Sequence, residues 1–212
     1  MKALVSIITV NYNGLRDTCE MIDSFRNHET YPHYEIIVVD NGSRLPEAEE
    51  IQERYRGNLV PGGSLSGSPA SDNPVPFPPV KVVRNINNGF AGGNNAGLKT
   101  AGGDYLFFIN NDTLIKEPVL EALVRRMECD PQRNGGVSPM LKFAACPDIL
   151  QYAGFTPLSS LTLRNASIGF MQQDGPRFRT PCETASLHGA AMMVLSLIHI
   201  SEPMRLQLIS YA

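Results

Sequence analysis

Short blocks of apolar residues alternate along the chain with longer segments in which apolar residues recur at a helical spacing. The apolar blocks have the length and the Val, Ile and Phe content of buried strands, and they cover residues 3–10, 34–39, 81–84 and 105–109. The helical segments cover residues 15–27, 46–55 and 118–127, the last with Pro118 at an early position where its missing N–H costs little. This alternation of strand and helix predicts an α/β fold with a mostly parallel sheet.

Other segments have a weaker pattern. Residues 85–97 are rich in Asn and Gly and predict a turn that leads into a helix through Leu98 and Lys99. Residues 135–141 and 152–163 predict shorter strands and connections. Residues 61–79 consist mostly of Pro, Gly and Ser, which cannot build a core, and predict a long exposed loop, with a lid or a partner-binding segment as the alternative.

Composition limits the class of protein. The 212 residues suffice for one domain with a sizeable core, and 42% hydrophobic against 18% charged residues indicates a folded chain. A net charge of −3 argues against nucleic acid as a partner. The four cysteines lie far apart without metal-binding spacing, so we expect reduced structural thiols. No run of about 18 apolar residues occurs, and we therefore expect a cytoplasmic location.

Polar turns rich in Asn, Asp and Gly follow four of the predicted strands, at residues 11–14, 40–43, 85–97 and 110–113. In a parallel sheet the carboxyl ends of the strands meet at one edge, where ligands bind. Few cations stand in these turns, so a nucleotide held there needs hydrogen bonds for its base and ribose and a metal ion for its diphosphate. Asp40 is a candidate for the first role and Asp112 for the second, with turn formation or helix capping as the alternative for each.

Four ordered motifs carry a resemblance to a known family. They read VSIITVNYN at 5–13, IVVDNGS at 37–43, NGFAGGNNAG at 88–97 and FINNDT at 108–113. Together they resemble the inverting family 2 glycosyltransferases, and more narrowly the rhamnosyltransferase and galactofuranosyltransferase-like branch, over residues 3–194. The resemblance implies the GT-A fold, a Rossmann-like, mostly parallel sheet flanked by helices. It also implies inverting transfer of a sugar, with rhamnose as a candidate, from a nucleoside diphosphate donor to a glycan or lipid-linked acceptor, assisted by Mg²⁺ or Mn²⁺.

The resemblance also implies roles for individual residues. The donor-binding set begins at the nucleoside, continues along the diphosphate-sugar and ends near the sugar: Thr9, Asn11, Tyr12, Asp40, Asn88, Gly89, Phe90, Asn94, Asn95, Asn110 and His188. Asn110 and Asp112 occupy the outer positions of the family's D-x-D metal motif, and since the first is Asn, metal binding would depend mainly on Asp112. For His188 the alternative is a packing residue.

The glycines in the third motif suggest a binding role for the backbone, independently of the family resemblance. Gly89, Gly92, Gly93 and Gly97 would let the backbone approach the phosphates closely, so that its N–H groups donate to phosphate oxygens. The alternative is a turn that binds no ligand.

The end of the sequence departs from the family. Residues 187–191 read LHGAA and resemble the family's Gly-Ala segment near the acceptor and sugar. In the family, the carboxylate that serves as general base lies some tens of residues beyond this segment, and no such residue is found here. Residues 195–212 resemble the translation of a transposase adapter used in sequencing libraries, with a natural apolar C-terminal strand as the alternative. We therefore expect an incomplete nucleotide-sugar-binding domain at 1–194, a non-native tail at 195–212, and weak or no transfer. A lipid-linked acceptor would place the protein at the inner face of the membrane.

Two other functions are considered. One is a nucleotide-sugar-binding remnant without catalysis. The other is a nucleotidyltransferase, which would be expected to carry a basic G-x-G loop after the first strand, and residues 11–14 lack it.

Overall fold

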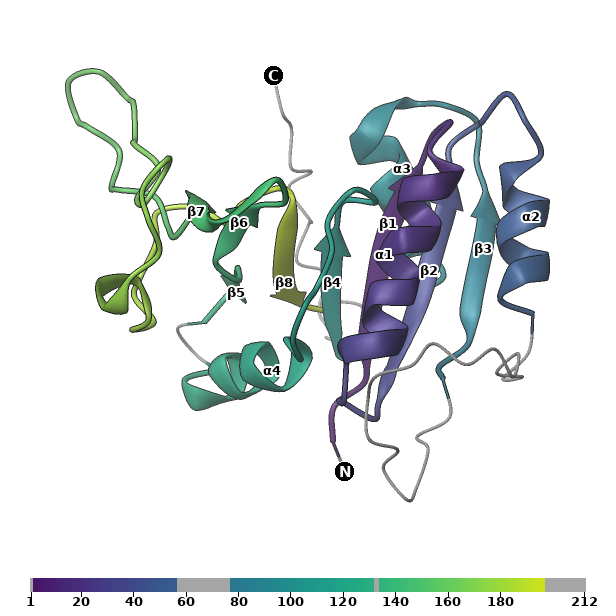
Figure 1. Cartoon of the computed structure of the whole chain (residues 1–212), viewed down its shortest axis with the longest axis horizontal. Helices are drawn as coiled ribbons and strands as arrows, with labels where there is room; N and C mark the ends of the chain where they lie inside the picture. The colour runs from purple at the N-terminus through teal and green to yellow at the C-terminus, as the bar shows by residue number, and fades with distance from the viewer. Residues whose placement is uncertain (1, 57–76, 132–133, 197–212) are drawn as a thin grey trace, which may run out of the picture.

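The computed structural model describes residues 2–56, 77–131 and 134–196, which form a six-stranded sheet with helices on both faces and a smaller two-stranded sheet beside it (Figure 1). The strand order is β3-β2-β1-β4-β8-β5. The parallel strands are β1 (Val5–Asn11), β2 (Tyr34–Asp40), β3 (Val80–Arg84) and β4 (Tyr105–Ile109). β8 (Ala191–Leu195) runs antiparallel to both β4 and the short β5 (Gly136–Val137). The predicted α/β fold with a mostly parallel sheet is confirmed.

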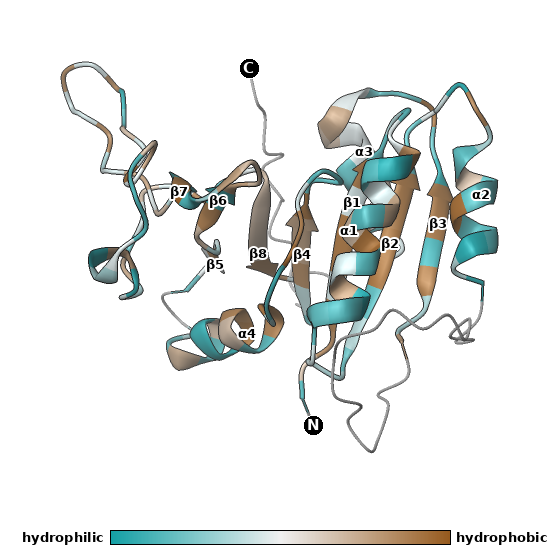
Figure 2. Ribbon diagram, viewed as in Figure 1, coloured by the Kyte–Doolittle hydropathy of each residue, from teal (hydrophilic) through white to brown (hydrophobic). Residues whose placement is uncertain are grey.

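Helices cover the two faces unequally. α1 (Leu15–His28), α2 (Glu47–Arg54) and α4 (Leu120–Cys129) pack on one face, and α3 (Gly89–Leu98) packs on the other. Since successive strand residues point to opposite faces, Ile7 joins the larger cluster with α1 while Ile8 joins the smaller cluster beside α3. Figure 2 shows the resulting pattern, with brown central strands and helices that are teal on their exposed sides.

The segment after α4 differs from the prediction. Residues 152–163 were predicted as shorter strands and connections, and the strand part is wrong: β7 (Cys146–Tyr152) ends where a strand was expected to begin, and β7 pairs with β6 (Leu141–Phe143) in the small sheet. Gly154 lies at φ +131°, a conformation that turns the chain out of the strand. Beyond it, Phe155 and Ser167 form only an isolated bridge.

The glycine-rich segment is also different from the prediction. Its glycines do not form a turn before a helix; residues 89–98 are themselves helical. A Cβ on Gly93 would lie 2.9 Å from Val10 Cγ1, and one on Gly97 would lie 2.6 Å from Ile8 Cγ2. These two glycines therefore let α3 pack closely on β1 and β2, so close packing explains their small size without any phosphate.

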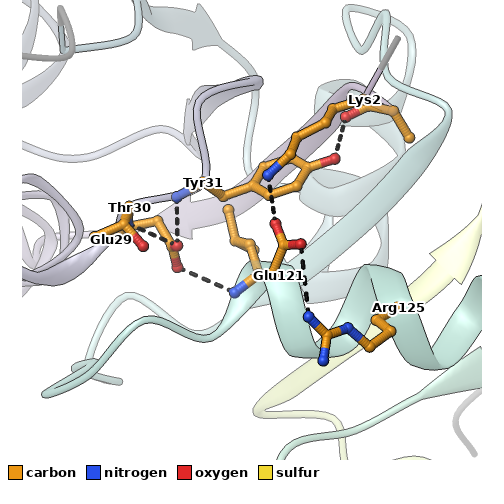
Figure 3. A network of polar contacts seen from close by, with 8 residues as sticks. Lys2, Glu29, Thr30, Tyr31, Glu121 and Arg125 are labelled. Atoms are coloured by element: carbon orange, nitrogen blue, oxygen red, sulfur yellow. Dashed lines mark hydrogen bonds and ion pairs between the residues drawn. The ribbon is translucent and has the colours of Figure 1, made fainter.

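One carboxylate fixes the start of α4 from another part of the chain (Figure 3). Glu29, just after α1, accepts hydrogen bonds through Oε2 from the N–H groups of Val119, at 2.9 Å, and Leu120, at 3.1 Å. Its Oε1 accepts from the N–H groups of Thr30 and Tyr31. These bonds satisfy N–H groups at the helix start that no residue inside the helix can satisfy.

The structure describes only part of two segments that the sequence analysis set apart, the Pro/Gly/Ser-rich loop and the C-terminal tail. Residues 57–76 of the Pro/Gly/Ser-rich segment lie outside the described residues, while Phe77 packs beside Tyr55, with ring centroids 6.5 Å apart. In the expected tail, Leu195 is the last residue of β8, and the Ser196 N–H donates to the Asp104 carbonyl at 2.8 Å. Residues 197–212 lie outside the described residues.

Glu35 makes stability depend on pH. Burial raises the pKa of this carboxyl, but hydrogen bonds from Lys81, Ser6 and the Gly102 N–H outweigh burial and lower it below its usual 4.5. The folded state therefore binds a proton less readily than the unfolded chain, and the stabilisation present above pH 4.5 is lost as the pH falls through the lowered pKa. We expect Glu35→Gln to flatten this loss of stability in urea titrations between pH 3 and 5, a range of about one unit on each side of the usual glutamate pKa.

The matched control is Glu117→Gln, because Glu117 is exposed and makes no hydrogen bond to the described residues. It should leave the pH profile of the free energy of unfolding unchanged. A Glu35→Gln profile that follows the wild-type profile would show that Glu35 does not cause the acid sensitivity.

Candidate functional site

The polar turns predicted from the sequence meet at one edge of the sheet. β1 to β4 are parallel, so the turns after Asn11, Asp40, Arg84 and Ile109 lie at their shared carboxyl edge. Because β8 runs antiparallel to β4, its first residues reach the same edge, and the Asn110 N–H donates to the Ala190 carbonyl at 2.9 Å. The candidate site is this edge, with residues 188–190 added from far along the chain.

Asn11 is the centre of a buried hydrogen-bond network. Its Nδ2 donates to Glu47 Oε2 at 2.8 Å, to Asp40 Oδ1 at 3.1 Å and to Ser43 Oγ at 3.2 Å. Its Oδ1 accepts from Thr18 Oγ1 at 2.7 Å. One amide thus joins the end of β1 to α1, to the turn after β2 and to the first turn of α2.

Asp40 has one carboxylate oxygen in this network and one outside it. Asn11 Nδ2, the Ser43 hydroxyl and the Ser43 N–H all donate to Oδ1. No bond from the described residues ends on Oδ2. Asp40 is 8% exposed, so this oxygen can accept a hydrogen bond from a ligand while Oδ1 holds the side chain in place.

The predicted nucleoside contacts differ in their exposure. Tyr12 is 47% exposed beside the turn, whereas Thr9 and Asn11 are both 0% exposed. Both of the last two side chains point to the α1 face of the sheet, because alternate residues of a strand point to opposite faces. Their contact with a nucleoside stays a prediction; Asn11 supports the edge from beneath, and Thr9 Oγ1 finds no partner among the described residues.

A set of asparagine side chains holds the start of α3 against the turn after β2. Asn41 Nδ2 donates to Asn87 Oδ1 and to the Gly89 carbonyl, and its Oδ1 accepts from Asn85 Nδ2 at 2.8 Å. Asn85 Nδ2 also donates to Asn88 Oδ1 at 2.9 Å. Asn41 was not among the residues predicted from the sequence, yet it connects two of the predicted turns.

The predicted diphosphate segment presents several exposed groups along α3. Asn88, Gly89 and Asn95 are exposed, and Phe90 is 50% exposed. Asn94 is half-buried, and its Nδ2 donates to the Phe90 carbonyl at 3.2 Å. Gly89 has φ +84°, and a Cβ there would meet no atom within 4 Å, so its backbone conformation rather than crowding favours glycine.

The residues after β4 offer oxygen ligands at the other end of the edge. Asn110 Oδ1 is buried without a hydrogen-bond partner among the described residues, and Asp112 is exposed. Such oxygens suit Mg²⁺ or Mn²⁺. In the part of the chain that the structure describes, no group of three or more His, Cys, Asp or Glu side chains could hold a metal ion. Asn110 and Asp112 are thus the residues at this end of the edge whose oxygens would suit such a cation.

His188 stands in an aromatic cluster next to this end of the edge. Its ring stacks on Phe155, with an interplanar angle of 6°, and lies 4.9 Å from the Tyr152 ring. Its Nδ1 accepts from the Ala190 N–H at 3.1 Å. Burial lowers the pKa of the imidazole, which favours its neutral form. His188 therefore packs against neighbouring aromatic rings, which was the alternative to donor binding in the sequence analysis. Its contact with a donor stays a prediction.

Besides Asn41, sequence reasoning missed four side chains of the site: Thr18, Ser43, Glu47 and Asn111. Thr18 carried a signal, because it occupies the apolar stripe of α1 in line with Ile22 and Phe25 and is fully buried. A polar residue on such a stripe indicates a buried hydrogen-bond partner. Glu47 carried no such signal, since an acidic residue in the first turn of a helix is ordinary.

The mostly parallel sheet with its flanking helices has the GT-A fold. The crystal structure of S. aureus TarS 1-349 has the same fold, with a TM-score of 0.50 at 19% identity over 76% of this chain and 42% of that chain. TarS 1-349 in complex with UDP-GlcNAc gives a TM-score of 0.50 at 20% identity over 66% of this chain and 34% of that chain.

Residues 6–137 match the family described as glycosyl transferase family 2, and the chain belongs to that family. An uncharacterised glycosyltransferase of Haemophilus influenzae is 26% identical over 62% of this chain and 37% of its own length. Glycosyltransferase GlyG of Streptococcus pneumoniae is 26% identical over 60% of this chain and 36% of its own length. The chain thus spans little more than a third of these relatives. Within its described residues, no helix has the length and apolar character of a membrane span.

Proposed function

We propose that the chain binds a nucleoside diphosphate sugar along the carboxyl edge of its sheet, as the donor site of a glycosyltransferase. The observation that carries the proposal is that no hydrogen bond from the described residues ends on Asp40 Oδ2 or on the buried Asn110 Oδ1 at this edge. Asp40 Oδ2 would accept from the base or ribose, and Asn110 Oδ1, with Asp112, would face the diphosphate and sugar. Membership of glycosyl transferase family 2 supports the same reading. A nucleotidyltransferase is not favoured.

The complete protein would transfer the donor sugar, with rhamnose as the candidate, to a glycan or lipid-linked acceptor with inversion. In such a reaction the acceptor hydroxyl attacks the anomeric carbon, its proton passes to a general base, and the nucleoside diphosphate leaves. Mg²⁺ or Mn²⁺ held by Asp112 and Asn110 would neutralise the charge that develops on the leaving diphosphate. We assign no general base to this chain, so donor binding is the property that tests the proposal.

Calorimetric titration tests the donor site. UDP-GlcNAc was present in a complex of the structural neighbour TarS 1-349, so UDP-linked sugars should be titrated first, followed by dTDP- and GDP-linked sugars, each with and without Mn²⁺. We expect binding that Mn²⁺ strengthens. Replacement of Asp112 by Ala should weaken binding about tenfold with Mn²⁺ and only slightly without it, because the variant removes a metal ligand.

Asp148→Ala is the matched control, because Asp148 is an exposed aspartate at β7, in the small sheet. It should bind as the wild type does. If no nucleoside diphosphate binds at millimolar concentration, the proposed function is wrong. If Asp112→Ala binds like the wild type in Mn²⁺, the metal assignment is wrong.

A further inference from the structure

A continuous chain of hydrogen bonds runs beneath the candidate site from the turn after β4 to the turn after β2. Asn111 Nδ2 donates to Thr18 Oγ1 at 3.1 Å, and Thr18 Oγ1 donates to Asn11 Oδ1 at 2.7 Å. Asn11 Nδ2 then donates to Asp40 Oδ1 and to Glu47 Oε2. Asn111 stands between Asn110 and Asp112, so the chain connects the metal end of the edge to the nucleoside end.

The direction of every bond in this chain is fixed. A hydroxyl has one hydrogen, and the Thr18 hydroxyl gives it to Asn11 Oδ1, so Thr18 can only accept from Asn111. With Oδ1 occupied, the NH₂ group of Asn11 must face the two carboxylates. Thr18 and Asn11 are completely buried, where water cannot replace a lost partner.

The residue types at positions 14 and 18 are explained by the hydrogen-bond chain rather than by packing of the hydrophobic core. Thr18 lies on the buried side of α1 among apolar neighbours such as Ile22, where an aliphatic residue would fill the space without burying a hydroxyl. At Gly14 a Cβ would lie 2.7 Å from Asn111 Nδ2. The small residue at 14 and the hydroxyl at 18 together make room for the Asn111 amide and bind it.

We propose that Thr18 is a positioning residue that holds the Asn110–Asp112 turn in register with the Asp40 corner, so that one donor molecule can contact both ends at once. The inference rests on the proposed donor site and extends it by assigning a residue that does not touch the donor. Thr18 acts through Asn111 on the diphosphate end and through Asn11 on the nucleoside end. Its removal should therefore affect ligands that reach both ends more than ligands that reach one.

Binding of a nucleoside and of its diphosphate separates these effects. The variant is Thr18→Val, which keeps the side-chain shape and removes the hydroxyl, and the conservative control is Thr18→Ser, which keeps the hydroxyl. UDP and uridine are titrated by calorimetry in Mn²⁺, with dTDP and thymidine or GDP and guanosine as the pair if one of those diphosphates binds the wild type more tightly. We expect Thr18→Val to weaken diphosphate binding about fivefold more than nucleoside binding, and Thr18→Ser to restore the ratio.

A second variant removes the Asn111 side chain that donates to Thr18, and so tests whether Thr18 acts through Asn111. Asn111→Ala removes the bond to Thr18 at a half-buried position, where loss of folding is less of a concern. If Thr18 acts through Asn111, the double variant should lose no more of the diphosphate preference than the single variants do. Equal weakening of nucleoside and diphosphate by Thr18→Val would overturn the inference and leave Thr18 a structural residue.

A measurement without ligand keeps the inference separate from the proposed function. In ¹⁵N-correlation spectra, Thr18→Val should shift amide resonances both at Asn110–Asp112 and at Asp40 and Ser43, and Thr18→Ser should shift them much less. Shifts confined to the neighbours of Thr18 in α1 would refute the coupling, whether or not a nucleotide binds. If the wild type binds no nucleotide but both ends shift, the donor site is wrong and the connection between the two turns stands.

Discussion

Replacement of Asn11 by Leu should lower the free energy of unfolding by about 4 kcal/mol and abolish nucleotide binding. The amide of Asn11 donates to Asp40 and Glu47 and accepts from Thr18, and all four residues are at least nine-tenths buried. The leucine leaves two carboxylates without this donor and one hydroxyl without its acceptor. Each buried group left without a partner costs about 1–3 kcal/mol, more where the group is charged.

Urea denaturation followed by circular dichroism measures this loss, and calorimetry on the same sample measures binding. Asn27→Ala is the control, since Asn27 is exposed near the end of α1 and makes no hydrogen bond to a described side chain; it should change stability by less than about 0.5 kcal/mol. A loss below about 1 kcal/mol for Asn11→Leu would mean that the network contributes little to folding.

Replacement of Gly97 by Ala should destabilise the protein by about 2 kcal/mol, although alanine is the better helix former. A Cβ at this position would lie 2.6 Å from Ile8 Cγ2 and 3.0 Å from Val39 Cγ2, and both neighbours are completely buried. α3 must move away from the sheet or the strands must shift, and such overpacking costs about 1–3 kcal/mol. We expect a cost at the upper end of this range, because the Cβ meets two buried side chains. The gain in helix propensity from glycine to alanine, about 1 kcal/mol, offsets only part of that cost.

Thermal and urea unfolding of Gly97→Ala should be compared with Gly175→Ala, because Gly175 has extended backbone and open space around its Cα. The double variant Gly97→Ala/Ile8→Ala provides a further check. If the clash with Ile8 causes the effect, the double variant should be less destabilised than the sum of the single variants. Additive losses would point to a different cause.

Local patterns in the sequence were enough to predict the parallel half of the sheet. Each of β1 to β4 is an apolar block followed by a polar turn, and α1 and α4 carry apolar stripes, so hydrophobic periodicity locates them within a residue or two. The same reasoning placed Asp40, Asn110 and Asp112 at one edge, because parallel strands end together.

The roles of individual residues depended on distances that a sequence does not contain. Glycine is a poor helix former, so residues 85–97 were predicted to be a turn before a helix, whereas close packing of Gly93 and Gly97 against Val10 and Ile8 makes glycine necessary in α3. Thr9 and Asn11 follow the strand alternation into the interior, which the motif alone does not show. The position of β8 could not be predicted because antiparallel pairing with β4 joins residues more than eighty positions apart.

This position of β8 sets an order in which the site can form as the chain folds. The Asp40 end of the edge is built from β1, β2, α1 and α2, which are neighbours in sequence, so short loops bring its groups together. The Asn110 end requires the Ala190 carbonyl beside Asn110, and that contact cannot form until Ala191–Leu195 has docked between β4 and β5. Contacts between distant residues form more slowly than local ones. A nascent chain would thus form the Asp40 corner, where we propose that the nucleoside binds, well before the Asn110 end, which we propose faces the sugar.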